Sequence, residues 1–295
     1  QKVPNWPETI KSLWDQSPYQ LRVVVLGSSS LQIQKGLSES LAGRYELIRV
    51  FHWTFTELNH VFNYTLEQYL VYGGYPASTR FEKNFDRWYA YMKDSIIESV
   101  IGKDILLNQN VKNPALFRQA FEILCQYPAQ EISYTKLLGQ LQDKGNTDLI
   151  KYYIELYSGA FLVYPLMKYS EKTYLRKSSC PKVLLACPAL YTFTKGPAVL
   201  DDLEIKGRLF ELAVGARLIQ LPGQLYYWRQ GDKEVDFVYE YKAKRYAVEV
   251  KSGRKKSYKG LAAFQESFPR SIPVIITPDA FTAFSENPQS FIQSF

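Results

Sequence analysis

Two carboxylates and one ammonium mark a short stretch of the chain, Asp236, Glu249 and Lys251. Asp236 lies within residues 234–238, and the other two lie within residues 246–253. Both runs are rich in Val, Phe and Tyr, and a polar segment separates them, which predicts a hairpin of two strands. Carboxylate oxygens are suitable ligands for magnesium, and a neighbouring ammonium can stabilise developing negative charge.

Strand geometry predicts how these side chains are arranged. Because successive side chains point to opposite faces of a strand, Glu249 and Lys251 are expected on the same face. Val248 is then expected to point into a core, and Val235 and Phe237 are expected to face away from Asp236. The remaining elements of the chain must therefore position one polar face of an otherwise apolar sheet.

Composition limits the classes of protein. The chain has 295 residues, of which 46% are hydrophobic and 22% charged, enough for about two domains with a sizeable core. A net charge of +7 permits a polyanionic partner but gives only weak support for nucleic acid. The three cysteines, Cys125, Cys180 and Cys187, lack the spacing of a zinc site and do not indicate a disulfide framework.

The histidine content and the lengths of the apolar runs limit the chemistry and the location of the chain. The chain contains only two histidines, His52 and His60, so catalysis or metal binding based on histidine is not expected. It shows no apolar run long enough to cross a bilayer and no leader of charged and then apolar residues. We therefore expect a cytoplasmic protein without membrane insertion or a membrane partner.

The N-terminal residues carry a family resemblance. Residues 21–26 form an apolar run that predicts a strand buried on both faces, as in parallel sheets. Several segments, in order, resemble the second half of the P-loop ATPase domain of bacterial and archaeal AAA-type ATPases with a further conserved domain at the C-terminus. The segments are QKVPNW (1–6), VLGSSS (25–30), SLAGR (40–44), FTEL (55–58) and YLVYGGYP (69–76).

One half of that ATPase domain is missing from the sequence. In the family, residues 1–6 would follow the Walker B strand directly, yet no Asp-Glu pair precedes them and no Gly-x-x-x-x-Gly-Lys-Ser/Thr occurs. ATP hydrolysis is therefore not expected of this chain, and ATP is a cofactor only together with the missing half. The resemblance implies that Ser28 positions the attacking water and that Arg44 contacts phosphate. Alternatively, Ser28 caps a helix and Arg44 is a surface residue.

The middle of the chain predicts helices. Residues 61–110 are expected to form a helical connector. In residues 111–180, three helices followed by a hairpin form the outline of a winged helix, in which the third helix can enter the major groove of DNA. The alternative use of such a module is packing between domains. The candidate DNA contacts are Asn146 and Lys151 on the third helix, and Lys168 and Lys172 along the wing.

Residues 181–295 predict the order helix, strand, strand, strand, helix, strand. This αβββαβ order is similar to the core of the restriction-endonuclease-like PD-(D/E)XK superfamily, which carries an acid on the first helix, Asp on the second strand and Glu-x-Lys on the third. Glu211, Asp236, Glu249 and Lys251 match these positions. The resemblance implies that Asp236 and Glu249, helped by Glu211, hold Mg²⁺ or Mn²⁺ for phosphodiester hydrolysis. Lys251 would orient the nucleophilic water or stabilise the transition state.

The predicted fold class is therefore a multidomain α/β protein. It comprises a P-loop ATPase remnant (1–60), the connector (61–110), a winged-helix module (111–180) and a restriction-endonuclease-like domain (181–295). DNA is the expected partner, with further backbone contacts from Arg254, Lys255 and Lys256. Further expected partners are the missing ATPase half and a second copy of the chain.

Two functions are compatible with the sequence, and a third depends on a longer chain. The first is a metal-dependent DNA nuclease. The second is a non-catalytic unit that docks DNA or protein, because a Glu-x-Lys pair also occurs as an ordinary solvated ion pair and a fold can persist after its chemistry is lost. The third is an ATP-driven switch.

Overall fold

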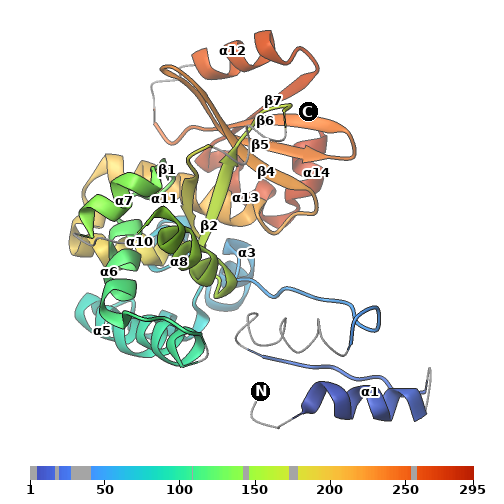
Figure 1. Cartoon of the computed structure of the whole chain (residues 1–295). Helices are drawn as coiled ribbons and strands as arrows, with labels where there is room; N and C mark the ends of the chain where they lie inside the picture. The colour runs from blue at the N-terminus through green and yellow to red at the C-terminus, as the bar shows by residue number, and fades with distance from the viewer. Residues whose placement is uncertain are drawn as a thin grey trace.

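The structure is a computed structural model of the whole chain. It describes residues 5–16, 20–27, 41–107, 109–141, 146–172, 179–253 and 258–295. The described part is an α/β protein in which helices surround a mixed sheet of seven strands (Figure 1). None of the described helices has the length and apolarity required to cross a membrane.

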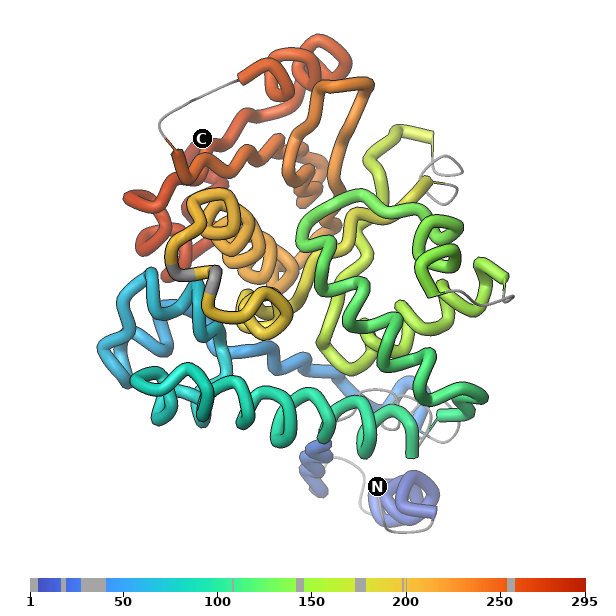
Figure 2. Tube along the Cα trace, turned by 90° about the vertical axis from the view of Figure 1, so that its left-hand side faces the viewer, coloured from blue at the N-terminus to red at the C-terminus, as the bar shows by residue number. Residues whose placement is uncertain are grey.

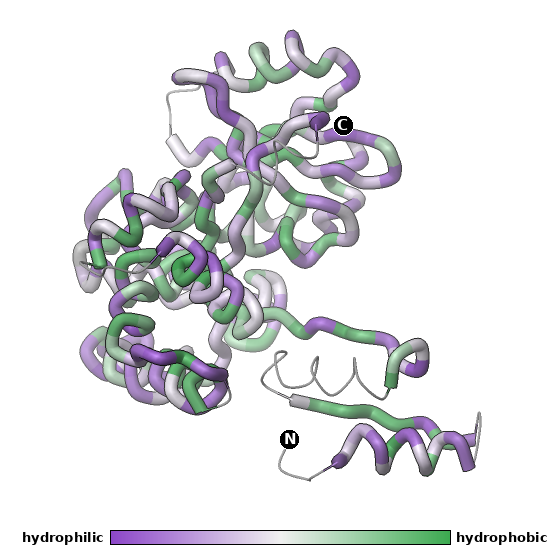
Figure 3. Tube along the Cα trace, in the orientation of Figure 1, coloured by the Kyte–Doolittle hydropathy of each residue, from purple (hydrophilic) through white to green (hydrophobic). Residues whose placement is uncertain are grey.

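The N-terminal elements lie apart from this body (Figure 1). Pro7 is the only buried residue of helix α1 (Trp6–Gln16). The strand predicted at residues 21–26 is wrong, because the described segment 20–27 pairs with no described strand. Val24 is 80% exposed and Leu26 is 86% exposed. An apolar segment forms a buried strand only where neighbouring strands satisfy its backbone, and Figure 3 shows this apolar segment at a distance from the sheet.

Helices fill the next part of the chain, as predicted. Capping boxes of Thr54 with Glu57 and of Thr65 with Gln68 begin two of them. Figure 2 shows the run from α5 to η3 spanning the width of the body. The elements are α3 (Phe55–Phe62), α4 (Leu66–Tyr72), η1 (Pro76–Phe81), α5 (Phe85–Tyr91) and the π-helical turns η2 (Met92–Ile97) and η3 (Ser99–Leu106).

Three further helices occur at the predicted places, α6 (Pro114–Cys125), α7 (Tyr134–Gln140) and α8 (Thr147–Gly159). Asn146 begins α8, because its side chain accepts a hydrogen bond from the backbone N–H of Leu149. The strand that follows α8 enters the large sheet. This group of helices therefore packs directly onto the sheet through α8.

The sheet has the order β1-β3-β2-β4-β5-β6-β7. Strands β2 and β4 are parallel, as are β6 and β7, whereas the other neighbours are antiparallel. It therefore joins strands on both sides of residue 180. The strands are β1 (Gln130–Glu131), β2 (Val163–Lys168), β3 (Lys182–Leu185), β4 (Gln224–Gln230), β5 (Lys233–Tyr241), β6 (Lys244–Val250) and β7 (Ser271–Ile276).

The C-terminal part confirms the predicted order of elements from α11 to β7. Helix α11 covers one face of the sheet so closely that a Cβ on Gly215 would lie 2.6 Å from Leu184 and 2.9 Å from Phe237. Helix α12 covers the other face with a second apolar cluster around Phe264. The helices are α10 (Pro188–Lys195), η4 (Gly196–Leu200), α11 (Leu203–Leu218), α12 (Lys259–Ser267), α13 (Pro278–Glu286) and α14 (Pro288–Gln293).

Candidate active site

A β-bulge places Asp236. The pairing of β4 with β5 shifts by one residue between Tyr226 and Trp228. Val235 therefore packs in the α12 cluster, while Phe237 packs in the core under α11. The predicted alternation, with both residues on one face, is wrong here because the extra residue of a bulge interrupts the period of two. Asp236 occupies the bulge between them.

The carboxylate of Asp236 marks the point where β5 and β6 part. The two strands pair from Tyr241 with Lys244 as far as Phe237 with Val248. Beyond this point the backbone N–H of Val250 donates a 2.7 Å hydrogen bond to Oδ2 of Asp236. A side chain thus replaces a backbone acceptor, which fixes the carboxylate beside the end of β6.

Glu249 and Lys251 form a close pair at the same end of β6, as expected for side chains on one face. The Nζ atom of Lys251 lies 2.5 Å from Oε1 of Glu249, and the two side chains are 16% and 10% exposed. The second oxygen, Oε2 of Glu249, is buried and has no hydrogen-bond partner among the described residues. Burial raises the pKa of Glu249, and the neighbouring Lys251 opposes that rise.

A lysine that the sequence analysis did not select stands at the centre of the site. Lys182, at the start of β3, is 1% exposed. Its Nζ lies 2.7 Å from Oε1 of Glu211 on α11 and 3.0 Å from Oε1 of Glu234, and donates a 3.3 Å hydrogen bond to the backbone oxygen of Asp236. Burial lowers the pKa of Lys182, but the charges of Glu211, Asp236 and Glu234 outweigh this effect and raise it overall. Lys182 is therefore a buried ammonium.

One signal in the sequence pointed to Lys182. It opens the apolar run of residues 182–185, and a charged residue in a strand buried throughout requires a buried partner of opposite charge. The sequence does not identify that partner, because Glu211 and Glu234 lie far along the chain. Arg208 adds a third cation, with its Nη1 3.3 Å from Oε2 of Glu211.

The cluster carries an excess of one negative charge. Burial, and next the charge of Glu211, raise the pKa of Asp236 well above the usual range of a carboxyl, although Lys182 and the hydrogen bond from Val250 oppose the rise. The site can therefore hold either a proton or an added cation. Its acids are Glu211, Glu234, Asp236 and Glu249, and its bases are Lys182, Arg208 and Lys251.

The donor set is compatible with a hard divalent cation in two respects. Its oxygens are carboxylates, which magnesium prefers, and Oε2 of Glu249 is a buried acceptor without a partner. The described residues nevertheless contain no group of three His, Cys, Asp or Glu side chains gathered for a metal. Lys182 accounts for this arrangement, because its ammonium lies against Glu211 and the backbone of Asp236.

The other predicted contacts are spread over the molecule. Arg44 forms an exposed ion pair with Asp15, 3.6 Å between Nε and Oδ1. The side chain of Asn146 is used in the cap of α8, and Lys151 pairs with Asp148 at 3.0 Å. Lys168 lines a cavity of about 390 Å³ that also contacts Glu131 and Arg229, whereas Lys172 is exposed. Ser28, Arg254, Lys255 and Lys256 lie outside the described residues.

Three family models match successive parts of the chain. Residues 1–59 match an AAA domain. Residues 63–196 match a domain of unknown function, DUF8612, and residues 206–287 match another, DUF4143. The last match covers most of the elements that carry the acid cluster, from α11 to α13.

Similar proteins occur in bacteria and archaea. An uncharacterized protein of Mycobacterium tuberculosis is 28% identical over 85% of this chain and 57% of its own length. An uncharacterized protein of Methanocaldococcus jannaschii is 24% identical over 81% of this chain and 56% of its own. An uncharacterized protein of Haemophilus influenzae is 23% identical over 61% of this chain and 47% of its own length.

The chain spans about half the length of these relatives. No solved structure matches it. The expected resemblance is thus supported at the level of the ATPase. The matches of residues 1–59 to the AAA domain and of residues 206–287 to DUF4143 support an AAA-type ATPase-like family for this chain.

Proposed function

We propose that the unit from α11 to β7 is a restriction-endonuclease-like domain that hydrolyses DNA phosphodiesters with Mg²⁺ or Mn²⁺. One observation carries the proposal. Glu211, Asp236 and Glu249 come from α11, β5 and β6 and influence one another electrostatically near the point where the two strands part, with Lys251 beside Glu249. A chance Glu-x-Lys pair on a solvated strand would lack these buried partners.

Asp236 and Glu249 would hold the metal ion, with Glu211 supporting them. When bound, such an ion neutralises charge on the scissile phosphate and acidifies a water molecule. The excess negative charge of the cluster favours its binding. Because the pKa of Asp236 is raised, a metal ion and a proton compete for this carboxylate.

Two lysines of the chain have different tasks in this proposal. Lys182 neutralises Glu211 and Glu234 inside the protein, which holds α11 against the sheet. Lys251 lies farther along the chain, beyond the end of β6, and its side chain is 16% exposed. It is therefore the ammonium that orients the attacking water or stabilises the charge of the transition state.

The role of ATP belongs to the longer protein. The chain contains no Gly-x-x-x-x-Gly-Lys-Ser/Thr, and it spans only about half the length of its relatives. In this proposal the other half supplies ATP binding and hydrolysis, and it is a partner of residues 1–59. A protein that includes this half should hydrolyse ATP, and turnover measured with and without DNA tests the coupling.

A specific observation favours a second function, a non-catalytic docking unit for DNA or protein. Lys182, Arg208 and Lys251 already balance most of the charge of the acid cluster without a metal. In this alternative the three helices α6, α7 and α8 with β2 act as a winged helix that docks the partner of an ATP-driven switch. A second copy of the chain is one such partner.

A cleavage assay separates the two functions. Single- and double-stranded DNA would be incubated with the protein and Mg²⁺ or Mn²⁺, and products would be resolved by length. Asp236→Asn and Lys251→Met are expected to reduce cleavage by about a hundredfold or more, as removal of a catalytic group does. Glu266→Gln and Lys83→Met, at exposed positions, serve as matched controls and should cleave like the wild type.

The binding measurement completes the test. One outcome is that the protein binds DNA with an affinity that salt weakens, while neither the wild type nor any variant cleaves the DNA with Mg²⁺ or Mn²⁺. That result leaves only the docking function. Cleavage that persists in both Asp236→Asn and Lys251→Met places the chemistry elsewhere and refutes the nuclease proposal.

A further inference from the structure

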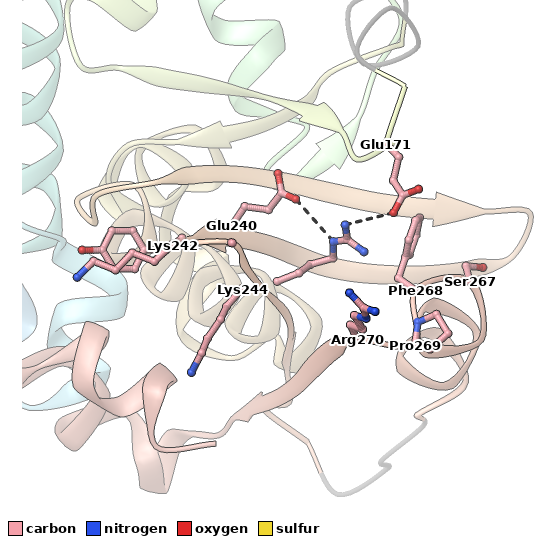
Figure 4. A pocket seen from close by; sticks show the side chains of 11 residues that line it. Glu171, Glu240, Lys242, Lys244, Ser267, Phe268, Pro269 and Arg270 are labelled. Atoms are coloured by element: carbon pink, nitrogen blue, oxygen red, sulfur yellow. Dashed lines mark hydrogen bonds and ion pairs between the residues drawn. The ribbon is translucent and has the colours of Figure 1, made fainter.

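A second charged site lies at the opposite end of the β5–β6 hairpin. It is an open cavity of about 700 Å³, referred to below as the hairpin-end cavity (Figure 4). The strands run for five residues between Lys244 and Glu249, so roughly 17 Å separates the two sites. The lining residues are Glu171, Glu240, Tyr241, Lys242, Ala243, Lys244, Arg245, Ser267, Phe268, Pro269 and Arg270.

Arg245 forms a fixed base of this cavity. Its guanidinium lies 4.8 Å from the ring centres of both Tyr169 and Phe268. Glu171 pairs with it at 3.3 Å and Glu240 at 3.6 Å, the two contacts drawn as dashed lines in Figure 4. Its Nε is buried and makes no hydrogen bond with a described residue. This buried Nε is the atom that lies 3.6 Å from Oε1 of Glu240, so the base is cationic and is held in place by its ion pairs and ring contacts.

Two further cations, Lys244 and Arg270, line the same cavity. Strands β6 and β7 are parallel, with Arg245 opposite Ser271, so Lys244 and Arg270 are neighbours where the strands begin. Both are exposed and are drawn in Figure 4 on neighbouring strands. Neither forms an ion pair with any residue that the structure describes. Like charges at facing positions repel each other, and a bound anion would convert this repulsion into attraction.

The charge balance identifies the class of anion. Lys242, Lys244, Arg245 and Arg270 oppose only Glu171 and Glu240 among the lining residues, which leaves two positive charges. A terminal phosphate carries nearly two negative charges at neutral pH and offers three acceptor oxygens. The planar fork of an arginine and the compact charge of a lysine together suit such a group.

We propose that the hairpin-end cavity binds a phosphate group, carried either by a nucleotide or by a nucleic acid. Lys244 and Arg270 hold the group, and the charge of Arg245 attracts it from the base of the cavity. The side chain of Glu171 is 66% exposed, so it can leave Arg245 when a phosphate enters. This site does not depend on the nuclease proposal, because none of its residues belongs to the acid cluster.

Binding experiments in EDTA test the cavity without any metal chemistry. The probes are a fluorescent single-stranded DNA with a 5′-phosphate, the same DNA with a 5′-hydroxyl, and AMP, ATP and inorganic phosphate as competitors. We expect the double variant Lys244→Ala, Arg270→Ala to bind the preferred probe about tenfold more weakly or worse. Lys83→Ala, which removes an exposed cation elsewhere, should change binding by less than about twofold.

The pattern among the probes identifies the source of the phosphate. Displacement of the DNA by AMP or ATP assigns a nucleotide, and preference for the 5′-phosphate assigns a nucleic-acid terminus. Equal binding of both DNAs, with strong salt dependence, assigns the backbone. In each of these cases the double variant must lose the signal.

One variant should act in the opposite direction. Glu171→Gln removes a competing acceptor from Arg245, so it should tighten binding of the same probe, while Asp232→Asn, at an exposed position just before β5, should leave it unchanged. The proposal is overturned if the double variant binds every probe as the wild type does, or if Glu171→Gln weakens binding as strongly as the double variant. Retained binding without DNA cleavage would refute the nuclease alone.

Discussion

The two ends of the β5–β6 hairpin contrast in how they treat charge. At the Asp236 end the acids are in excess and largely buried, and Lys182 and Lys251 lie within 3.0 Å of their partners. At the Lys244 end the cations are in excess, and all but Arg245 are exposed to water. The difference shows that burial, more than the number of charges, determines how much a charged group contributes to folding.

The largest effect is expected from Lys182→Met, which removes the buried ammonium. Glu211 and Glu234 then face each other and Asp236 without their cation, and loss of one partner from a buried pair costs about 3–5 kcal/mol. The free energy of unfolding, measured with urea, should fall by that amount. Lys206→Met is the matched control, because Lys206 pairs with Glu67 on the surface and should cost less than about 1 kcal/mol.

A second substitution makes this prediction sharper. Adding Glu211→Gln to Lys182→Met removes one of the stranded charges, so part of the lost stability should return. A loss below about 1 kcal/mol in Lys182→Met alone would show that Lys182 does not neutralise the cluster and would remove the contrast between the two ends.

The next effect concerns pH at the Asp236 end. The pKa of Asp236 is raised in the folded protein, so the folded state keeps a proton that the unfolded state has released. Stability attributable to this group is therefore present at low pH and is lost as pH rises through the range above the usual carboxyl pKa. One proton gives a slope of at most about 1.4 kcal/mol per pH unit.

Asp236→Asn cannot titrate but retains an oxygen that can accept from Val250. It should flatten the decline of stability between mildly acidic and mildly alkaline pH and should be more stable than the wild type at the alkaline end. Unfolding curves over that range provide the measurement. The exposed Asp232→Asn should leave the slope unchanged, and a wild-type slope in Asp236→Asn would contradict the shifted pKa.

Local signals in the sequence were sufficient for much of the fold. Asn146 and Asp202 begin their helices with side-chain hydrogen bonds, and such caps depend on residues within one turn. The hairpin turn at Lys242 and Ala243, both with positive φ, also lies at the predicted place. Residues 21–26 show the limit, because an apolar run becomes a strand only when other segments pair with it.

Only those features of the candidate site that depend on residues close together in the sequence could be predicted. The spacing of Glu249 and Lys251 placed both on one face, and the structure pairs them. Lys182 was missed because its partners lie on α11 and β5, distances along the chain that periodicity does not encode. The bulge at Asp236 was missed because it depends on the register with β4, which no pattern within β5 specifies.

A smaller effect is expected at the base of the hairpin-end cavity. Arg245→Met loses contacts with the rings of Tyr169 and Phe268 and two partly exposed ion pairs. Each of these is a modest interaction, so the free energy of unfolding should fall by about 1–2 kcal/mol. Arg270→Met, at an exposed position, should change it by less than about 0.5 kcal/mol. Equal costs for the two variants would mean that the aromatic contacts of Arg245 contribute nothing.

The smallest effect, and the one whose sign matters most, is expected from Lys244→Thr. Lys244 and Arg270 directly precede the paired residues Arg245 and Ser271, so removal of Lys244 should relieve repulsion between nearby cations, and Thr is suited to strands. In buffer of low ionic strength and free of phosphate, the variant should be more stable than the wild type by about 0.3 kcal/mol, and salt should abolish the gain.

Addition of inorganic phosphate should then stabilise the wild type more than the variant, because a ligand of the folded state stabilises only the protein that binds it. A destabilised Lys244→Thr that is insensitive to both salt and phosphate would mean that the exposed end, like the buried one, has its charges already neutralised.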